Sequence, residues 1–235
     1  ICYYFIDKKI SIIEGWNMGN NKAMANISKA TIGRLPAYHR YLTEKKAEGE
    51  KAVSSTAIAE ELHLNAVQVR KDLAAISSAA GKPKLGFDVE ELIADIDRFL
   101  GYDNVSDAVL VGAGGLGSAL VGYDGFKNYG LNIVAAFDCD PARIGKTIGG
   151  VRVYDVKELR HLVLRLNVRI GIIAVPKEAA QAVADELAAG GVRAIWNFAP
   201  VHLSLPENIA VKNEDMAASL AILSQRLAEI LNNEK

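Results

Sequence analysis

Cysteine is scarce in this chain, and no apolar stretch is both long and free of charge. The 235 residues include only Cys2 and Cys139, too few for a disulfide framework or a zinc site, so the sequence favours a reducing compartment, the cytoplasm. Short apolar stretches within residues 1–26 are interrupted by charged residues, which argues against a membrane span and a secretory signal. We expect residues 1–26 to form a poorly ordered extension.

A strong net charge is also absent, because the whole chain carries −1. The charge is unevenly distributed, however. Residues 27–87 contain ten Lys or Arg and six Asp or Glu, a net charge of +4, whereas residues 88–235 carry −6. A basic N-terminal part that is joined to an acidic C-terminal part predicts an anionic partner for the former.

Glycine is plentiful by comparison and forms a motif of fixed spacing. The apolar run Val109–Val111 is typical of a strand that is buried on both faces. Gly112, Gly114 and Gly117 follow as G-x-G-x-x-G, and an apolar helical pattern begins at Ser118. The first glycine permits a tight turn, the second lets a pyrophosphate approach the backbone, and the third lets the helix pack close to the sheet. The motif predicts a dinucleotide-binding turn, in which the helix N-terminus meets the phosphates; a glycine turn without a ligand is the alternative.

Asp138 supports the same interpretation. It ends a second apolar run, Ile133–Phe137, about twenty residues beyond the glycines. A carboxylate in this place accepts hydrogen bonds from a ribose 2′-hydroxyl and repels a 2′-phosphate. NAD(H) is thus favoured over NADP(H), although Arg143 lies near enough in the sequence to attract a phosphate.

Strand and helix patterns continue to alternate as far as Val211. We expect further strands at 151–154, 170–175, 194–198 and 209–211, with helices at 156–168 and 176–189. This alternation predicts an α/β fold, a Rossmann domain with a parallel doubly wound sheet whose ligand crevice lies beyond the carboxyl ends of the strands. The expected cofactor-binding residues lie at those ends: Gly112, Ala113, Gly114, Gly115, Leu116, Gly117, Asp138, Val175, Pro176, Asn197 and Phe198.

Residues 27–87 carry a different pattern, which is typical of a winged helix-turn-helix domain. Pro36 suggests that a first amphipathic helix begins about there and runs to about Ala47. Helices at 56–62 and 66–77 follow, separated by a short turn whose Asn65 is a good N-cap. Glycine, proline and lysine among apolar residues at 79–87 predict a β-hairpin wing.

Polar side chains of this domain lie where a helix-turn-helix contacts DNA. The second helix of the pair enters the major groove, and lysines of a wing contact backbone phosphates. A solvated surface on a packing domain that binds no nucleic acid is the alternative. The predicted DNA-binding residues are Ser54, Ser55, Gln68, Arg70, Lys71, Lys82 and Lys84.

The remaining segments connect and extend these two domains. Residues 88–104 predict a linker helix, the Rossmann domain is expected at 105–212, and residues 213–235 predict a C-terminal helix. The last helix carries an apolar stripe that packs either on its own sheet or on a partner subunit. A helix-turn-helix protein that reads palindromic DNA needs a partner, so we expect a homodimer. The stripe consists of Met216, Leu220, Leu223, Leu227 and Leu231.

Six stretches carry a pattern of their own: 29–36 (KATIGRLP), 69–73 (VRKDL), 111–117 (VGAGGLG), 136–141 (AFDCDP), 175–176 (VP) and 197–200 (NFAP). Together, and in this order, they resemble the Rex family of redox-sensing transcriptional repressors. The resemblance spans residues 27–230 and implies a winged-helix domain on a Rossmann domain, assembled as a domain-swapped homodimer. The wing departs from the family pattern, because lysine replaces an arginine and an aromatic pair is absent.

The resemblance also implies a function. Members of the family bind operator DNA when NAD+ prevails and release it when NADH accumulates. By position, Arg40, Tyr123 and Asp215 correspond to the family's switch residues. A carboxylate can choose between a guanidinium and a phenol hydroxyl, which gives two discrete arrangements.

Two other functions stay open at this stage. An NAD-dependent dehydrogenase needs a proton donor beside a substrate pocket, but His161 and His202 have no obvious carboxylate partner in the sequence. A CoA-binding Rossmann protein uses a similar glycine turn. We predict a cytoplasmic repressor that binds NAD(H) and double-stranded operator DNA, with no catalytic residues, no metal and no membrane partner.

Overall fold

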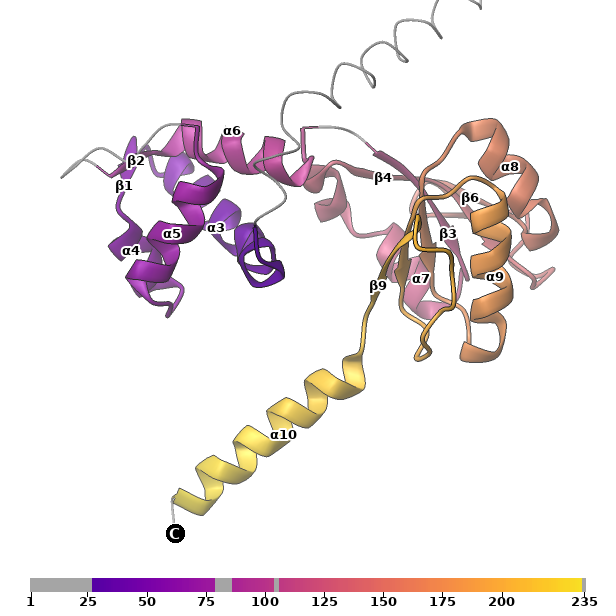
Figure 1. Cartoon of the computed structure of the whole chain (residues 1–235). Coiled ribbons are helices and arrows are strands. Elements are labelled where there is room, and N and C mark those ends of the chain that lie inside the picture. The colour runs from indigo at the N-terminus through magenta and orange to yellow at the C-terminus, as the bar shows by residue number, and fades with distance from the viewer. Residues whose placement is uncertain (1–26, 79–85, 104–105, 234–235) are drawn as a thin grey trace, which may run out of the picture. The chain divides into compact units, whose positions relative to one another are not determined.

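The computed structural model describes residues 27–78, 86–103 and 106–233, which form two compact units (Figure 1). The first unit ends at Gly101 and the second begins at Tyr102. Each unit has a hydrophobic core of its own.

The first unit combines helices with a short antiparallel sheet. Fully buried side chains from all of its described helices, among them Leu35, Ile58, Leu73 and Ile96, meet in one core. The helix expected as a linker therefore packs as part of this unit. The described elements are α3 (Lys29–Ala47), β1 (Ala52–Val53), α4 (Ser55–Glu61), α5 (Ala66–Ile76), β2 (Phe87–Asp88) and α6 (Val89–Leu100).

Polar caps define where the helices of this unit begin. Ser28 Oγ accepts a hydrogen bond from Thr31 N at 3.1 Å, and Asn65 Oδ1 accepts one from Val67 N at 2.9 Å. α3 begins at Lys29, so the expected start near Pro36 is wrong. Pro36 lies inside the helix, where it removes one helical N–H. The helix begins instead directly after the Ser28 cap.

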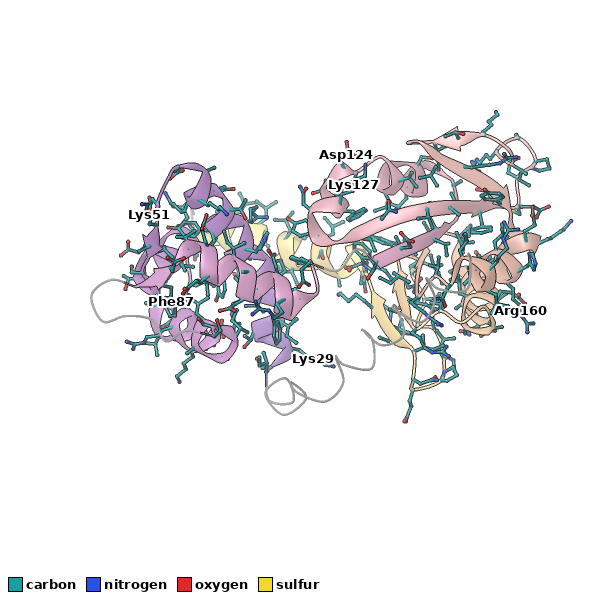
Figure 2. The ribbon with its side chains drawn as sticks, turned by 90° about the horizontal axis from the view of Figure 1, so that it is seen from above. Lys29, Lys51, Phe87, Asp124, Lys127 and Arg160 are labelled. Carbon is teal, nitrogen blue, oxygen red and sulfur yellow. The ribbon has the colours of Figure 1, made fainter. Side chains whose placement is uncertain are left out.

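A strand pair marks the base of the predicted wing. β1 and β2 pair antiparallel with Val53 opposite Phe87, and Figure 2 labels Phe87 and the neighbouring Lys51. Gly86 has a φ of +78°, and a Cβ on it would lie 2.2 Å from Val53 O, so only glycine fits beside β1. The predicted hairpin residues 79–85 lie outside the described part of the chain.

The second unit is built on a sheet whose described strands lie in the order β5-β6-β4-β3-β7-β8-β9. All neighbours pair in parallel except β5 with β6, an antiparallel edge that no sequence pattern predicts. The six parallel strands have the Rossmann order, with the switch point between β3 and β7. The strands are β3 (Ser106–Val111), β4 (Leu131–Asp138), β5 (Thr147–Ile148), β6 (Val151–Asp155), β7 (Ile170–Ile173), β8 (Ala194–Asn197) and β9 (Ala210–Asn213).

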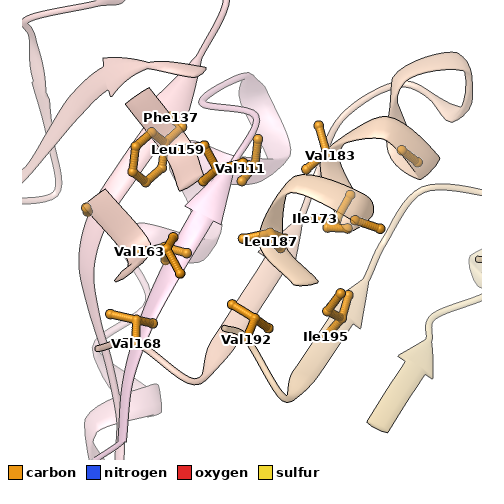
Figure 3. Close-up of a cluster of buried hydrophobic side chains, with 14 of the residues drawn as sticks. Val111, Phe137, Leu159, Val163, Val168, Ile173, Val183, Leu187, Val192 and Ile195 are labelled. Carbon is orange, nitrogen blue, oxygen red and sulfur yellow. The ribbon is translucent and has the colours of Figure 1, made fainter. Parts of the chain in front are cut away.

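Alternate residues of the central strands face opposite sides of the sheet. Val111 and Phe137 face α8 and α9, where they pack with Val163 and Leu187 (Figure 3). Leu110 faces the other side and packs in the cluster that includes Leu120 of α7. The parallel sheet is thus covered on both faces. The helical elements are α7 (Gly115–Val121), η1 (Asp124–Tyr129), η2 (Val156–Glu158), α8 (Leu159–Leu166), α9 (Lys177–Ala189) and α10 (Met216–Asn233).

The apolar row on α10 is exposed in the single chain. Leu220, Leu223, Leu227 and Leu231 keep between 51% and 65% of their surface accessible. Met216, the expected first member of the row, begins the helix, but its side chain lies outside the described part. None of the helices in the described ranges has the length and hydropathy that crossing a membrane requires.

Candidate functional site

The turn after β3 brings the glycines of the motif against backbone atoms. Gly112 has a φ of +99°, and a Cβ on it would lie 2.4 Å from Ala174 O. A Cβ on Gly117 would lie 1.9 Å from Gly112 O, so glycine alone lets α7 pack this close to β3. Gly114, the N-cap residue of α7, offers no side chain that would shield the first N–H groups of that helix from an anion.

The rest of the turn has both a buried and an accessible part. Ala113 is 4% exposed and packs in the hydrophobic cluster that includes Leu110, so it anchors the turn to the sheet. Gly115 has open space where a Cβ would lie, and Leu116 is 39% exposed. The backbone from 114 to 116 is therefore the part that a ligand can approach.

Asp138, at the end of β4, fixes the position of this turn. Its Oδ2 accepts a hydrogen bond from Ala113 N at 2.8 Å, and its Oδ1 accepts one from Asp140 N at 2.9 Å. Arg143 Nη1 donates to Oδ2 at 3.1 Å. Burial raises the pKa of Asp138, but the hydrogen bonds from Asp140, Arg143 and Ala113 outweigh it and hold that pKa below its usual value. The carboxylate is therefore ionised at neutral pH.

Arg143 lies beside the glycine turn and is shared by two carboxylates. Its guanidinium is 3.1 Å from Asp138 Oδ2 and 3.5 Å from Asp140 Oδ2. A Cβ on Gly114 would lie 3.5 Å from Arg143 Nη1, which places this cation next to the expected pyrophosphate position. The two carboxylates outnumber the single cation, so the local charge opposes an additional 2′-phosphate.

The ends of β7 and β8 carry the other predicted cofactor contacts. Val175 lies against the turn, since its Cγ1 would be 3.0 Å from a Cβ on Gly112, and Pro176 is the N-cap residue of α9. Asn197 is fully buried. Phe198, the next residue, is partly buried and packs against Trp196 with ring centroids 4.8 Å apart.

The amide of Asn197 is committed to the protein itself. Its Nδ2 donates to Val201 O at 2.8 Å and to Asn213 Oδ1 at 2.9 Å, and its Oδ1 accepts from Ala199 N at 3.0 Å. These bonds hold the chain after β8 in place. Asn197 therefore shapes this edge of the crevice through the backbone, a role that its position in the sequence does not reveal.

A row of aromatic rings connects Tyr123 with β8. Tyr123 packs edge-on to Phe126 at a centroid distance of 4.9 Å, and Phe126 packs edge-on to Trp196 at 5.6 Å. Trp196 Nε1 donates to Glu214 Oε1 at 2.7 Å. Tyr123 is 55% exposed at the outer end of the row.

This row ends next to the start of α10. Asp215 follows Glu214, and its Oδ1 accepts from Ala218 N at 2.9 Å, which caps the helix. The contacts through Trp196 thus connect Tyr123 with Glu214, the residue that precedes Asp215 in the chain. The third predicted switch residue, Arg40, is exposed on α3 of the first unit.

In the first unit, the buried carboxylate of Asp72 joins α3 to α5. Its oxygens accept hydrogen bonds from Arg34 Nε at 2.7 Å, the Tyr38 hydroxyl at 2.8 Å, the Thr31 hydroxyl at 3.1 Å and Gln68 Nε2 at 2.8 Å. Asp72 is 2% exposed. This network fixes the expected recognition helix on its scaffold.

The network shifts the ionisation of its members. Burial raises the pKa of Asp72, but the hydrogen bonds, that from Arg34 foremost, outweigh it, so the pKa lies below the usual value. Burial and the hydrogen bond to Asp72 raise the pKa of Tyr38 to about 12. At neutral pH Asp72 is therefore an ion that only accepts hydrogen bonds, and Tyr38 is a neutral donor.

The predicted DNA-binding residues divide by position. Gln68, Arg70 and Lys71 are exposed on α5. Ser54 caps α4, where its Oγ accepts from Ala57 N at 3.0 Å, and Ser55 is the first residue of that helix. The wing lysines, Lys82 and Lys84, lie outside the described residues.

Sequence patterns missed the buried carboxylate. Asp72 lies three residues after Val69 and one before Leu73, both fully buried, so an acidic residue occupies the apolar face of α5. An acidic residue on an apolar helix face was the sequence signal that could have indicated a buried ion pair. The partner of Asp72, Arg34, is 38 residues away in the sequence, and no local pattern connects the two.

The described residues hold no group of side chains suited to a metal ion. His161 is exposed on α8. His202 Nδ1 lies 3.5 Å from the amide of Asn213. An acid–base pair of histidine and carboxylate, as hydride transfer to a carbonyl would use, is not formed by either residue in the described contacts.

Family models match part of each unit. Residues 26–74 match the family "Putative DNA-binding protein N-terminus", and residues 103–201 match "CoA binding domain". The chain is 43% identical over 204 residues to the redox-sensing transcriptional repressor Rex of Clostridium beijerinckii, covering 87% of this chain and 96% of that protein. Identity to Rex of Desulforamulus reducens is 45% over 202 residues, which cover 86% and 96%.

Solved structures give the same result. RSP, described as a Rex-family repressor, is 36% identical with a TM-score of 0.80, and the match covers 88% of this chain and 97% of that chain. The structure of RSP with β-NAD+ and operator DNA matches with a TM-score of 0.82 over 88% and 95%. RSP with β-NADH matches with a TM-score of 0.79 over 89% and 99%.

Proposed function

The chain belongs to the Rex family of redox-sensing transcriptional repressors, and on this basis we propose that it represses transcription according to the balance of NADH and NAD+. One observation carries the proposal: a single chain holds a backbone turn shaped for a dinucleotide and a separate unit with an exposed helix-turn-helix. RSP, whose structures contain NAD+ with operator DNA or NADH, matches both units at once. We also propose that the protein works in the cytoplasm, where its ligands are found.

The nucleotide binds across the carboxyl edge of the sheet in this proposal. The N–H groups at the start of α7 meet the pyrophosphate, with Gly112, Gly114 and Gly117 allowing its approach. Asp138 faces the adenosine ribose, and Val175 with Pro176 borders the crevice beside it. Phe198 and Tyr123 are the residues that we place near the nicotinamide, where NADH and NAD+ differ in charge and ring shape.

DNA binds to the first unit through α5 and the wing. Arg70 and Lys71 contribute positive charge, and Ser54 and Ser55 at the start of α4 donate to phosphate oxygens. We place Lys82 and Lys84 on the wing for the same purpose. The network around Asp72 keeps α5 at a fixed angle during binding.

A homodimer completes the proposal. A second subunit buries the exposed leucines of α10. The same subunit presents a second recognition helix to a palindromic site. Arg40 and Tyr123 then compete for Asp215 as the nucleotide changes. Moving such a two-state equilibrium from 1:99 to 99:1 takes about 5.5 kcal/mol of differential affinity, which two nucleotide sites share.

A gel-shift titration tests this function. Operator-like palindromic DNA, selected from a random pool by the protein, is titrated with NADH, NAD+ and CoA at equal concentrations. We expect NADH to release the DNA at lower concentrations than NAD+, and CoA to leave the complex intact. Release by CoA alone would favour the CoA-binding alternative, and steady hydride transfer to a carbonyl compound would favour a dehydrogenase.

A further inference from the structure

We infer that Gln68 selects an adenine in each half of the DNA site, because Asp72 holds its amide in the orientation that matches this base. The inference rests on the proposed function, DNA binding through α5, and adds the chemical identity of one base. Gln68 is exposed near the N-terminus of α5, which is the part of a recognition helix that meets base edges.

The orientation of the Gln68 amide follows from which atoms can donate and which can only accept a hydrogen bond. Asp72 is ionised and can only accept hydrogen bonds. The atom of Gln68 that contacts Asp72 Oδ1 at 2.8 Å must therefore be the amide nitrogen. Turning the amide over would place Oε1 against a buried carboxylate, so the alternative orientation is strongly disfavoured.

Asp72 itself cannot move to follow Gln68. Arg34 binds it through Nε at 2.7 Å and Nη2 at 2.9 Å, and the Tyr38 hydroxyl donates to it at 2.8 Å. These donors belong to α3, so the carboxylate is a fixed point of the scaffold. Gln68 is held by one hydrogen bond from Nε2 to Asp72. The second N–H and Oε1 of its amide therefore stay available to a partner outside the protein.

The remaining capacity matches adenine. One hydrogen of Nε2 is used by Asp72, which leaves Oε1 as an acceptor and the second N–H as a donor. In the major groove, adenine offers an N6 amino donor next to an N7 acceptor, whereas guanine offers two acceptors. Cytosine offers a donor without an adjacent acceptor, and thymine an acceptor next to a methyl group. A donor–acceptor pair is thus satisfied completely by adenine.

Val67 supports an A·T pair at or beside this position. It precedes Gln68 on α5 and is 50% exposed, so it brings an apolar surface to the same groove. The thymine methyl is the apolar group that the major groove presents. Gln68 therefore favours the adenine, and Val67 favours the thymine, of A·T pairs at or beside this position.

Selection from a pool of random duplex DNA, followed by sequencing, tests the inference with the full chain. Four proteins are compared: wild type, Gln68→Ala, Gln68→Lys and, as a control on the same helix, Lys71→Ala. Wild type should prefer adenine at one position in each half-site. Gln68→Ala should reduce that preference by roughly 5- to 150-fold and leave the other positions unchanged.

Gln68→Lys makes the sharper test. A lysine can still donate to Asp72, but it has no acceptor, so the preferred base at that position should change from adenine to guanine. Lys71→Ala should instead weaken binding to all sequences by a similar factor. Thermal unfolding of each variant confirms that the first unit is folded.

The outcomes separate this inference from the proposed function. If wild type selects a site but Gln68→Ala and Gln68→Lys keep the wild-type base profile, or if the affected base is not adenine, the assignment of Gln68 is wrong while repression stands. If Gln68→Ala abolishes binding, the profile of Gln68→Lys decides in the same way. If wild type selects no sequence at all, the proposed function itself fails.

Discussion

Replacing Gly117 with alanine should abolish nucleotide sensing while leaving DNA binding intact. The added Cβ would lie 1.9 Å from Gly112 O and 3.1 Å from Leu110 Cδ2. Because the nearer atom belongs to the backbone of the turn, α7 must move away by about 1 Å, which takes its first N–H groups out of hydrogen-bond reach of a pyrophosphate. Each hydrogen bond to a charged group contributes about 1.5–3 kcal/mol. Losing two of them weakens NADH binding by more than about 100-fold.

Calorimetric titration with NADH measures this loss, and a gel shift with operator DNA shows whether NADH still releases the DNA. Gly122→Ala is the matched control at the end of α7, because its Cβ would meet Ser118 O at 3.5 Å, an ordinary contact. It should bind NADH within about threefold of wild type. The reasoning is refuted if Gly117→Ala, folded by circular dichroism, binds NADH as tightly as this control.

Three further predictions concern other parts of the chain. Asp72→Asn should destabilise the first unit by about 1.5–3 kcal/mol in chemical denaturation, because the charged hydrogen bond to Arg34 is lost while Arg34, 25% exposed, stays partly solvated; a change below about 1 kcal/mol would contradict the network. In wild type the pKa of Asp72 is depressed, so its stabilisation is present above the unfolded pKa near 4 and is lost as the pH falls through the lower folded value, which acid unfolding followed by circular dichroism can detect. Leu223→Asp should convert the proposed dimer to a monomer in light scattering and weaken operator binding, whereas Gln225→Asp, an exposed polar site two residues on, should leave the proposed dimer intact.

The sequence predicts those features that local chemistry determines. The glycine spacing and Asp138 identify the turn because each glycine has a local steric reason. Buried parallel strands were recognisable as apolar runs, but β5, with two residues, is too short to have a pattern. Pro36 was a misleading start signal, since a cap at Ser28 begins α3 upstream of it.

Contacts between distant segments could not be predicted in the same way. Asn197 was predicted to be a cofactor contact from its position after a strand, and the bond of its amide to Asn213 became visible only in the fold. The pairing of Arg143 with Asp138 needs the turn after β4 to fold back on that strand end. The roles of polar side chains are therefore harder to predict than those of glycines, because the role of a polar side chain depends on a hydrogen-bond partner that can lie far away in the sequence.

Buried carboxylates connect the predicted functional elements to their scaffolds in both units. Asp72 joins α5 to α3 through Arg34, Asp138 holds the glycine turn, and Asp95 accepts from Ser78 N at 2.7 Å, just before the predicted wing. Each is at most 6% exposed, and burying such a charge is costly unless several donors surround it. An apolar side chain in the same place would bury area without fixing a direction, whereas a carboxylate with several donors sets angles as well as distances. Positioning rather than net stability is therefore the physical reason that we assign to these three charges, because each carboxylate anchors a segment that carries or adjoins predicted ligand contacts.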